Sequence, residues 1–271
     1  MKTVKSKYLL ASDFDRTLSF SGKISDEDIR AIKRFRSDGN IFGVVTGRDY
    51  VYSYKIFSEK ALFPFDFLSM ASGALGSDAS GNIIYSSPVR GDVPYGKSTL
   101  ARELITRILD LTHTPCGISS EKSRMNFHPD MPNGGEISGV LYSSLNDLSS
   151  VTEFVHANAR CTNIEEAAAI REKLFSEFSE YLTPMQNGTA IDIPKKGVDK
   201  AYGVSCVAKH FGIDKECVFT AGDNHNDVPM LRAFCSFAIS SGTDAAKEAA
   251  EFVSDSIGEI IDLIYKIDMQ S

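Results

Sequence analysis

The 271-residue sequence has no surplus of basic residues, because 29 Lys and Arg stand against 36 Asp and Glu, giving a formal net charge of −7. Without excess cations to neutralise a phosphate backbone, a nucleic-acid partner is not expected. No apolar run approaches the ~20 residues of a membrane-spanning helix. The first apolar run, Tyr8–Ala11, is also too short for a signal peptide. The sequence therefore predicts a protein with neither a membrane nor a nucleic-acid partner.

Cysteine is scarce and widely spaced, and no two cysteines form a C-x-x-C pair or lie at zinc-ligand spacing. This pattern favours small, core-filling thiols in a reduced, cytoplasmic protein. The sequence also shows no internal repeat and no low-complexity segment. With 42% hydrophobic and 24% charged residues, its composition is that of a globular protein. The five cysteines are Cys116, Cys161, Cys206, Cys217 and Cys235.

Short apolar runs alternate with amphipathic segments at the beginning and end of the chain. Strands, each followed by a helix pattern, are typical of a doubly wound, mostly parallel α/β sheet. Ser25 with Asp28 marks one helix start, and Gly39 its end. Strands are expected over 8–12, 41–45, 65–71, 217–221 and 237–240, and helices over about 25–39, 49–59, 199–211 and 226–233, with two closing helices.

The alternation is interrupted near residue 73 and resumes after Ile193. The intervening segment is rich in turns and mixes short strands with helices, which indicates a second, α+β unit. We therefore predict a core formed by 1–81 and 194–271, with an inserted domain at 82–193. Within the insertion, strands are expected over 82–86 and 137–143, and helices over about 98–111, 147–157 and 165–180.

Two polar segments follow the first two strands, where open α/β sheets bind ligands. In an extended backbone, residues two apart face the same side, so Asp13, Asp15 and Thr17 are expected to point together. Converging carboxylates need an offsetting cation, and Mg²⁺ is a hard ion that binds carboxylates together with phosphate oxygens. Thr46 and Gly47, at the end of the second strand, offer a hydroxyl and a free amide to an anion. A solvated acidic strand end and an ordinary turn are the alternatives.

Two further segments lie in the closing part of the chain. Asp199 has the character of a helix N-cap, which places Lys200 in the first turn, where a cation opposes the helix dipole. This misfit suggests that the lysine holds an anion. The segment Gly222–Leu231 brings Asp223, Asn226 and Asp227 directly after a strand, although Asn and Asp are also common in plain turns.

Taken in order, the four segments resemble the haloacid dehalogenase (HAD) superfamily, and more closely its Cof-type sugar-phosphate phosphatases with a class IIB cap. The fourth segment matches the family's Gly-Asp-x-x-Asn-Asp-x-x-Met-Leu motif over Gly222–Leu231. The long interval between Thr46 and Lys200 leaves room for the family's cap. The resemblance implies a HAD-like Rossmannoid core with an inserted α+β cap, and a Mg²⁺-dependent phosphatase acting on a small phosphorylated metabolite, a sugar phosphate or a similar phosphomonoester.

The resemblance also implies roles for individual residues. It makes Asp13 the nucleophile that forms an aspartyl-phosphate, and Asp15 the general acid/base. Asn226 reaches either a phosphate oxygen or a metal-bound water, and Asp227 either orients water on the metal or holds Lys200. In full, it assigns phosphate binding to Thr46, Gly47, Lys200 and Asn226, and Mg²⁺ binding to Asp13, Asp15 (through its carbonyl), Asp223 and Asp227.

Two positions depart from the family pattern. Arg16 replaces the usual glycine after the second aspartate, and either favours an anionic substrate or points into solvent, the preferred interpretation. Ser72 replaces the asparagine of the family's Asn-Gly-Ala. In the insertion, Arg124 and His128 are candidates for substrate contact, although a solvated position is preferred for both.

Two other functions remain open. A phosphomutase of the same superfamily would return the phosphoryl group to the substrate. A non-catalytic phosphoacceptor or binding module is the alternative from a different class. The size of the insertion argues against the binding module, because a receiver-type domain needs only ~120 residues. The presence of Asp15 argues against an inactive enzyme.

Overall fold

The computed structural model describes residues 7–59 and 63–268, and the contacts divide the chain into two compact units. Unit 1 comprises residues 1–48, 52–85 and 199–271, and unit 2 comprises residues 49–51 and 86–198. The sequence places these boundaries four or five residues earlier. The difference at the first boundary arises because the strand after Gly81 is part of the sheet of unit 1, next to the strand before it.

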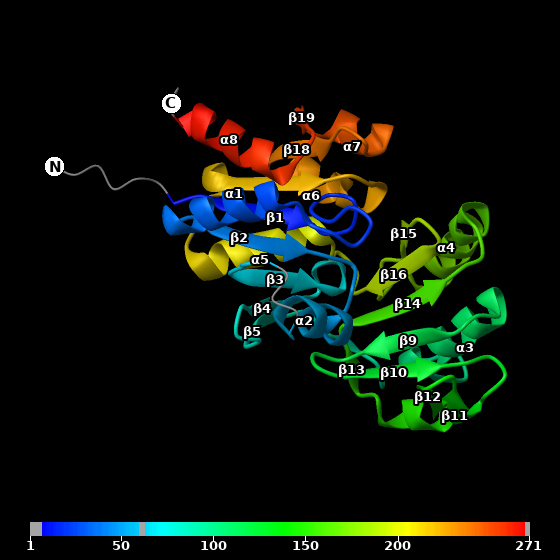
Figure 1. Cartoon of the computed structure of the whole chain (residues 1–271). Helices are drawn as coiled ribbons and strands as arrows, with labels where there is room; N and C mark the ends of the chain where they lie inside the picture. The colour runs from blue at the N-terminus through cyan, green and yellow to red at the C-terminus, as the bar shows by residue number, and fades with distance from the viewer. Residues whose placement is uncertain (1–6, 60–62, 269–271) are drawn as a thin grey trace. The chain divides into compact units, whose positions relative to one another are not determined.

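Unit 1 is built on an eight-stranded, mostly parallel sheet with the order β19-β18-β17-β1-β2-β3-β4-β5 (Figure 1). β1 pairs in parallel with β2 on one side and β17 on the other, so its carboxyl end is the topological switch point at which such sheets bind ligands. The predicted doubly wound α/β core is confirmed. The strands are β1 Leu9–Asp13, β2 Ile41–Val45, β3 Phe67–Met70, β4 Leu75–Asp78, β5 Ile83–Ser86, β17 Val218–Gly222, β18 Cys235–Ile239 and β19 Phe252–Ser254.

Side-chain alternation along β1 determines where Asp13 points. Leu9 and Ala11 belong to a buried cluster that also contains apolar residues of α5 (Lys200–Phe211). Successive residues of a strand face opposite sides of the sheet, so Asp13 lies on the same face as Ala11. The apolar pattern of the strand therefore brings the carboxylate to the side of the sheet on which α5 begins.

The helices of unit 1 cover the sheet in pairs, with α1 (Asp26–Ser37) packed beside α8 (Ile257–Asp268), and α5 beside α6. Ser25 caps α1 by accepting a hydrogen bond from the Asp28 amide, as predicted, and Asp28 also accepts one from the Gly258 amide of α8 (2.7 Å). The remaining helical segments are α2 Tyr50–Glu59, whose first two residues count with unit 2, α6 Val228–Ala233, α7 Asp244–Ala249, and the 3-10 turns η1 Ala71–Gly73, η3 Lys215–Cys217 and η4 His225–Asp227.

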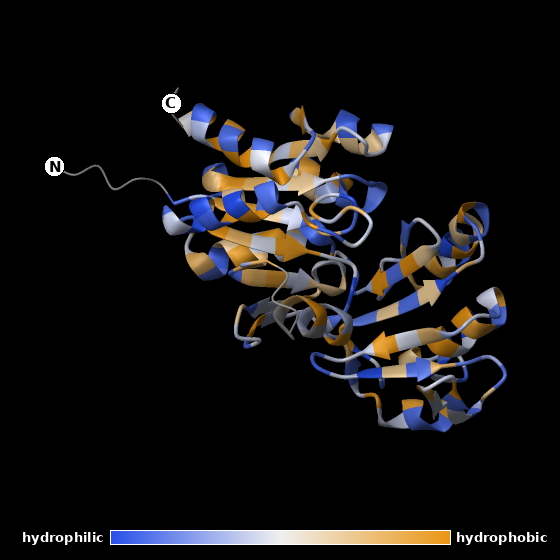
Figure 2. Cartoon of the chain, viewed as in Figure 1, coloured by the Kyte–Doolittle hydropathy of each residue, from blue (hydrophilic) through white to orange (hydrophobic). Residues whose placement is uncertain are grey.

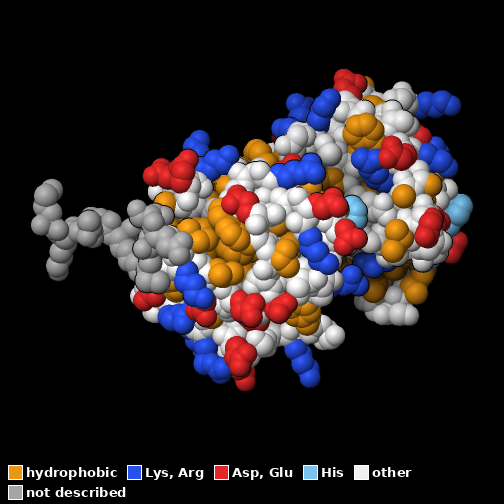
Figure 3. Space-filling model, turned by 90° about the horizontal axis from the view of Figure 1, so that it is seen from above, with side chains coloured by type: hydrophobic (Ala, Val, Ile, Leu, Met, Phe, Trp, Pro, Cys, Tyr) orange, Lys and Arg blue, Asp and Glu red, His pale blue; other side chains and the backbone are white. Residues whose placement is uncertain are grey.

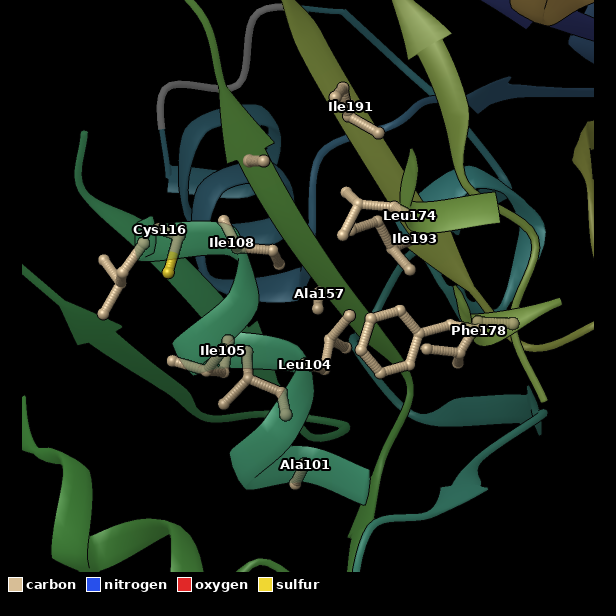
Figure 4. Close-up of a cluster of buried hydrophobic side chains, with 14 of the residues drawn as sticks. Ala101, Leu104, Ile105, Ile108, Cys116, Ala157, Leu174, Phe178, Ile191 and Ile193 are labelled. Atoms are coloured by element: carbon tan, nitrogen blue, oxygen red, sulfur yellow. The ribbon is translucent and has the colours of Figure 1, made fainter. Parts of the chain in front are cut away.

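Unit 2 is an α+β unit around a five-stranded antiparallel sheet of order β10-β9-β14-β16-β15. α3 (Leu100–Thr112) and α4 (Ile164–Phe178) pack apolar side chains against it, and Figure 4 shows Leu104, Phe178 and Ile193 gathered in this core. The other segments are β6 Val89–Arg90, β7 Pro94–Tyr95, β8 Ser98–Thr99, β9 Cys116–Ser119, β10 Arg124–Phe127, β11 Asn133–Ile137, β12 Val140–Ser144, η2 Leu145–Ser150, β13 Glu153–Phe154, β14 His156–Arg160, β15 Met185–Asn187 and β16 Ala190–Pro194.

The helix predicted over about 147–157 is wrong. The chain forms only the short 3-10 turn η2 and then continues in extended form through β13 and β14. Leu148, Val151 and Phe154 are buried at a spacing that resembles one face of a helix. Pairing of β14 with β9 and β16 overrides this local pattern, because it fills the middle of the sheet.

Two strand expectations also need correction. The strand predicted over 137–143 is the turn and second strand of a hairpin, in which β11 pairs with β12 across Ser138 and Gly139, both at positive φ. β19 was not expected, because its three residues are too few to show a pattern. β18 pairs with it in parallel at the edge of the large sheet.

Charged side chains on the surface and thiols in the core are distributed as in an ordinary globular protein. α8 alternates between hydrophobic and hydrophilic residues (Figure 2), and acidic and basic side chains are interspersed on the face that Figure 3 shows. All five cysteines are free, and Cys116 and Cys161 fill the core of unit 2. Within 7–59 and 63–268, no helix is both long and apolar enough to cross a membrane.

Candidate active site

The centre of the site is an ion-pair triad at the carboxyl end of β1. Lys200 Nζ donates to Asp13 Oδ1 at 2.6 Å and to Asp227 Oδ1 at 2.5 Å. All three side chains are at least nine-tenths buried, so solvent screens these charges little. Both partners of Lys200 in this structure are thus carboxylates of the protein itself, and Asp227 contacts the lysine directly.

The start of α5 places Lys200 in this position. Asp199 caps the helix by accepting a hydrogen bond from the Tyr202 amide (2.9 Å), as predicted. Gly73 of η1 packs against this first turn so closely that a Cβ there would lie 1.9 Å from the Asp199 carbonyl oxygen. Since Gly73 also has a φ of +95°, only glycine fits, and the turn after β3 braces the helix end that carries the lysine.

The loop after β17 holds Asp227 rigidly. Asp227 Oδ2 accepts hydrogen bonds from the amides of Asp223 and Asn224, both at 3.0 Å. A Cβ at Gly222 would lie 2.5 Å from the Asp227 Cβ, so the glycine of the motif is needed for the loop to fold back on itself. Because its second oxygen is fixed in this way, Asp227 presents its first oxygen to Lys200.

Asp223 completes a group of three buried carboxylates. Its Oδ1 accepts a hydrogen bond from the Thr17 hydroxyl (3.1 Å), and one oxygen each of Asp13, Asp223 and Asp227 lie within 4.8 Å of one another. When all three are ionised, Lys200 offsets only one of three negative charges. A set of hard oxygen donors with surplus negative charge fits Mg²⁺, and Asp13 and Asp223 are the residues that would hold it.

Burial dominates the ionisation of this group. It raises the pKa of Asp13 to about 8, against the opposing effect of Lys200. It also raises the pKa of Asp223 to about 6, with the neighbouring Asp227 adding to the rise. The pKa of Lys200 is raised as well, because Asp13 and Asp227 outweigh the effect of its burial. The carboxylates are therefore costly to ionise until a further cation arrives.

Asp15 has a different partner from Asp13. The extended backbone ends at Asp13, and Asp15 pairs instead with Arg48 in the loop after β2. Arg48 Nη2 lies 2.7 Å from Asp15 Oδ1, Nε lies 3.1 Å from Oδ2, and the guanidinium covers the Phe14 ring. In this structure Asp15 thus contacts Arg48, whereas the Thr17 hydroxyl contacts Asp223 of the buried group.

Arg48 is the site residue that the sequence reasoning missed. It directly follows Thr46 and Gly47. A positive charge in a loop that is expected to bind an anion is the feature of the sequence that could have indicated it. Thr46 is buried, and its hydroxyl accepts a hydrogen bond from the Arg48 amide (3.2 Å). Gly47 is partly exposed beside it, and Asn226 is buried in η4, next to Asp227 in sequence. The register of β1 with β2 and β17 places all these loops at the same edge of the sheet.

The turn after β3 is strained. Ala71 and Ser72 both adopt left-handed conformations (φ 52° and 54°), which are unusual for residues other than glycine, asparagine and aspartate. The Ala71 amide donates to the Arg48 carbonyl (2.8 Å), and the Ser72 amide to the Thr46 carbonyl (3.0 Å). The family's asparagine tolerates this conformation better than serine does. Serine at position 72 therefore costs some conformational free energy, which these two hydrogen bonds offset.

In unit 2, the Arg124 side chain is only 10% exposed and is held by polar groups, whereas the sequence favoured a solvated position. Its guanidinium binds Asp49 Oδ2 (2.5 Å), Asn158 Oδ1 (2.6 Å) and Asn126 Oδ1 (2.7 Å). A Cβ at Gly117 would lie 2.1 Å from Arg124 Nη2, so glycine leaves the space in which the guanidinium lies. The other candidate, His128, is partly buried against Tyr142.

Comparison with known proteins places this geometry in a family. Residues 10–262 match the haloacid dehalogenase-like hydrolases. The 5-amino-6-(5-phospho-D-ribitylamino)uracil phosphatase of Bacillus subtilis is 26% identical over 253 residues, covering 90% of each chain. Among solved structures, a HAD subclass IIB sugar phosphatase has a TM-score of 0.74 at 20% identity, over 96% of this chain and 99% of that one.

A HAD/COF-like hydrolase from Plasmodium vivax has a TM-score of 0.77 at 20% identity, over 98% of both chains. Structural likeness at this identity supports the fold. The sequence match spans both the core and the insertion, and it includes all four polar segments. The predicted resemblance is confirmed: the chain belongs to the haloacid dehalogenase-like hydrolase family.

Proposed function

We propose that this hydrolase is a Mg²⁺-dependent phosphatase that cleaves a small phosphomonoester through an aspartyl-phosphate on Asp13. The observation that carries the proposal is the buried group of Asp13, Asp223 and Asp227 around Lys200, at the topological switch point of the sheet. A buried carboxylate beside a lysine and a hard-cation site combines a nucleophile with charges that stabilise a phosphoryl group.

The chemistry follows in two displacements. An oxygen of Asp13 attacks phosphorus, the bond to the alkoxide breaks, and Asp15 donates a proton to the departing oxygen. Water then attacks the aspartyl-phosphate, Asp15 accepts its proton, and inorganic phosphate is released. Asp15 must separate from Arg48 at least in part to reach the leaving group, because both of its oxygens contact the guanidinium in this structure.

The other residues of the site hold charge in place. Thr46, the Gly47 amide, Lys200 and Asn226 would bind the phosphoryl oxygens, and Asp13, the Asp15 carbonyl and Asp223 would hold the metal. Asp227 fixes Lys200. When bound, Mg²⁺ supplies positive charge that offsets the carboxylates and the phosphoryl group.

For the substrate class, we propose a small phosphorylated metabolite, with unit 2 acting as the cap that selects it. The Bacillus subtilis relative is named for a phosphorylated ribitylaminouracil, and one structural neighbour is a sugar phosphatase. Both names are consistent with a phosphate on a polyhydroxylated chain. Five free thiols fit a reducing compartment, so we place the enzyme in the cytoplasm.

The deciding experiment is a phosphate-release screen over phosphorylated sugars, nucleotides and cofactors, including the ribitylaminouracil phosphate, with Mg²⁺ and with EDTA. Asp13→Asn is the matched control, because the amide has the shape of the carboxylate but cannot attack phosphorus. We expect at least a ~10³-fold loss of rate in the variant with retention of the fold by circular dichroism. Wild-type turnover in EDTA, or substantial turnover by Asp13→Asn, would contradict the mechanism.

A phosphomutase would use the same nucleophile but return the phosphoryl group to the substrate. Assaying phosphate release and isomer formation with and without a sugar bisphosphate activator separates the two enzymes. Net release of phosphate without an activator is the expected result.

A further inference from the structure

Arg16 adopts a conformation that arginine rarely takes. Its φ is +69°, in the left-handed region that favours glycine. An L-residue other than glycine, asparagine or aspartate costs about 1–2 kcal/mol there. The turn is held by hydrogen bonds from the Arg16 amide to the Ser19 carbonyl and from the Ser19 amide to the Phe14 carbonyl, both 2.8 Å. Such strain gathers at ligand sites, where the surrounding structure enforces it.

The position of Arg16 in the chain brings it to the edge of the candidate site. It lies between Asp15, which pairs with Arg48, and Thr17, which donates to Asp223. The Arg16 side chain is exposed, so its guanidinium is accessible to an anion beside the loop that carries Asp15.

Arg16 takes no part in the ion pairs of the site. Asp13 and Asp227 share Lys200, and Asp15 has Arg48. Across the residues that the structure describes, Arg16 forms no ion pair and no side-chain hydrogen bond. It is thus an exposed cation next to Asp15 in the chain, without an ion-pair partner and in a backbone conformation that costs free energy.

We propose that Arg16 binds a second anionic group of the substrate, so that this enzyme prefers phosphomonoesters that also carry a carboxylate or another phosphate. The inference rests on the proposed function and narrows its substrate class. The planar guanidinium, with its fork of N–H donors, matches both kinds of anion. Monophosphates of uncharged sugars lack the second anionic group that Arg16 would bind, so Arg16 should not improve their binding.

The chain allows a variant that removes the charge without weakening the fold. Arg16→Gly relieves the left-handed strain, and Arg16→Asn tolerates it, so both should melt at or above the wild-type temperature. Arg16→Lys keeps the charge but loses the fork. Arg30→Gln is the matched control, because Arg30 is an exposed arginine on α1, outside the site.

The test compares kcat/KM for three classes of substrate at constant ionic strength. These are phosphoglycolate, fructose 1,6-bisphosphate, and two phosphomonoesters without a second anionic group, glucose 6-phosphate and p-nitrophenyl phosphate. We expect Arg16→Gly and Arg16→Asn to lower kcat/KM about tenfold for the substrates with two anionic groups, mainly by raising KM. The kcat/KM values for the other two substrates should be unchanged. Loss confined to one substrate identifies carboxylate or phosphate as the group bound. Equal loss for all substrates, or a preference that survives in Arg16→Gly, overturns the proposal.

A binding measurement separates this inference from the proposed function. In the Asp13→Asn background with Mg²⁺, calorimetry compares phosphoglycolate and fructose 1,6-bisphosphate with inorganic phosphate, each with and without Arg16→Gly. The inference is supported if a ligand with two anionic groups binds roughly tenfold more tightly than inorganic phosphate and this preference is lost in Arg16→Gly. That result supports it even if the wild-type protein hydrolyses none of these ligands. Absence of that preference overturns it, even if phosphatase activity is found.

Discussion

At the residue scale, the site depends on one buried lysine. Lys200 lies where a cation opposes the helix dipole, and it is tolerated because two carboxylates contact it directly. The sequence could predict the anion from the misfit of the lysine alone. The misfit does not indicate which anion, because Asp13 and Asp227 lie 187 and 27 residues away along the chain; only the family resemblance offered Asp227 as a partner.

The pairing of Asp15 with Arg48 could not be predicted from the sequence for a related reason. Alternation within a strand is a local rule, and it stops at Asp13, where the strand ends. Beyond that point, the direction of a side chain is set by a partner on another loop. Arg124 shows the same effect, since its partner Asp49 is 75 residues away.

The raised carboxylate pKa values predict how stability responds to pH and metal. Without a divalent cation, the pKa of Asp13 is about 8 when folded and about 4 when unfolded, so the folded state binds more protons between these values. Stability should therefore fall as pH rises from about 4 to 8, with Asp223 contributing up to about pH 6. Mg²⁺ favours the ionised carboxylates and should counteract the fall.

Thermal melting in EDTA and in Mg²⁺ checks this expectation. The gain in Tm on adding Mg²⁺ should be greater at pH 8 than at pH 6. Asp223→Asn, which removes one charge from the group, should reduce the gain at both values. An equal gain at the two pH values would show that Mg²⁺ does not bind these carboxylates.

Replacing Arg48 with methionine should affect reactions that need an acid. The pair with Asp15 is half-exposed, so its loss should cost about 1 kcal/mol of stability or less. Asp15 would lose the partner that orients it, and kcat for sugar phosphates should fall about ten- to a hundredfold. p-Nitrophenyl phosphate should lose much less, because its leaving group departs without a proton. A uniform loss over both substrates would mean that Arg48 acts elsewhere in the site.

At the scale of elements, the core could be predicted and the insertion only in part. The strands of unit 1 are continuous apolar runs because helices cover both faces of a parallel sheet, so each run marks a strand. In unit 2, Leu148, Val151 and Phe154 mimic a helix although the chain is partly extended, because only pairing with distant strands decides between the two. The intrinsic helix and strand propensities of these residues do not depend on distant strands, so they cannot predict which structure forms.

The contact between η1 and α5 can be tested with two glycines of similar conformation. A Cβ added at Gly73 (φ +95°) would lie 1.9 Å from the Asp199 carbonyl oxygen, whereas one added at Gly212 (φ +66°), at the end of α5, would have nothing within 4 Å. Gly73→Ala should destabilise the protein by about 3 kcal/mol or more and lower activity, because it displaces the helix end that carries Lys200. Gly212→Ala should cost only about 1 kcal/mol and leave activity intact.

Chemical denaturation and phosphate release together check this pair. Similar losses of stability in both variants would mean that the backbone conformation, and not the close contact, sets the cost. Full activity in a destabilised Gly73→Ala would show that the placement of Lys200 does not depend on η1.

At the scale of the whole molecule, the chain separates the groups that we assign to chemistry from a second unit with its own core. Asp13, Thr46, Lys200 and Asp227 all belong to unit 1, although the insertion divides their sequence. Unit 2 has a separate hydrophobic cluster, built on α3, α4 and its own sheet. Such a division is expected if unit 2 is a cap that selects the substrate. Because each unit has its own core, the effect of deleting unit 2 can be tested.

We expect a shortened chain without residues 86–198, joined by a short Gly/Ser linker, to fold as the α/β unit. Both ends of the excised segment are fixed to the same part of unit 1. The Tyr85 hydroxyl lies 2.6 Å from Ser69 Oγ and its ring 6.4 Å from that of Tyr202, while Asp199 packs on Gly73. A linker of a few residues should therefore replace the insertion without strain.

The shortened chain should keep the Mg²⁺-dependent gain in Tm and weak activity on p-nitrophenyl phosphate, because unit 1 supplies every group that we assign to the chemistry. It should lose discrimination among phosphorylated metabolites, measured as the spread of kcat/KM over the same panel as for the full chain. Arg16 remains in unit 1, so a residual preference for substrates with two anionic groups should survive the deletion while the ranking among monophosphates of uncharged sugars disappears. If the full ranking persists, selection lies in unit 1 and the cap proposal fails, because unit 2 would then contribute nothing that distinguishes one leaving group from another.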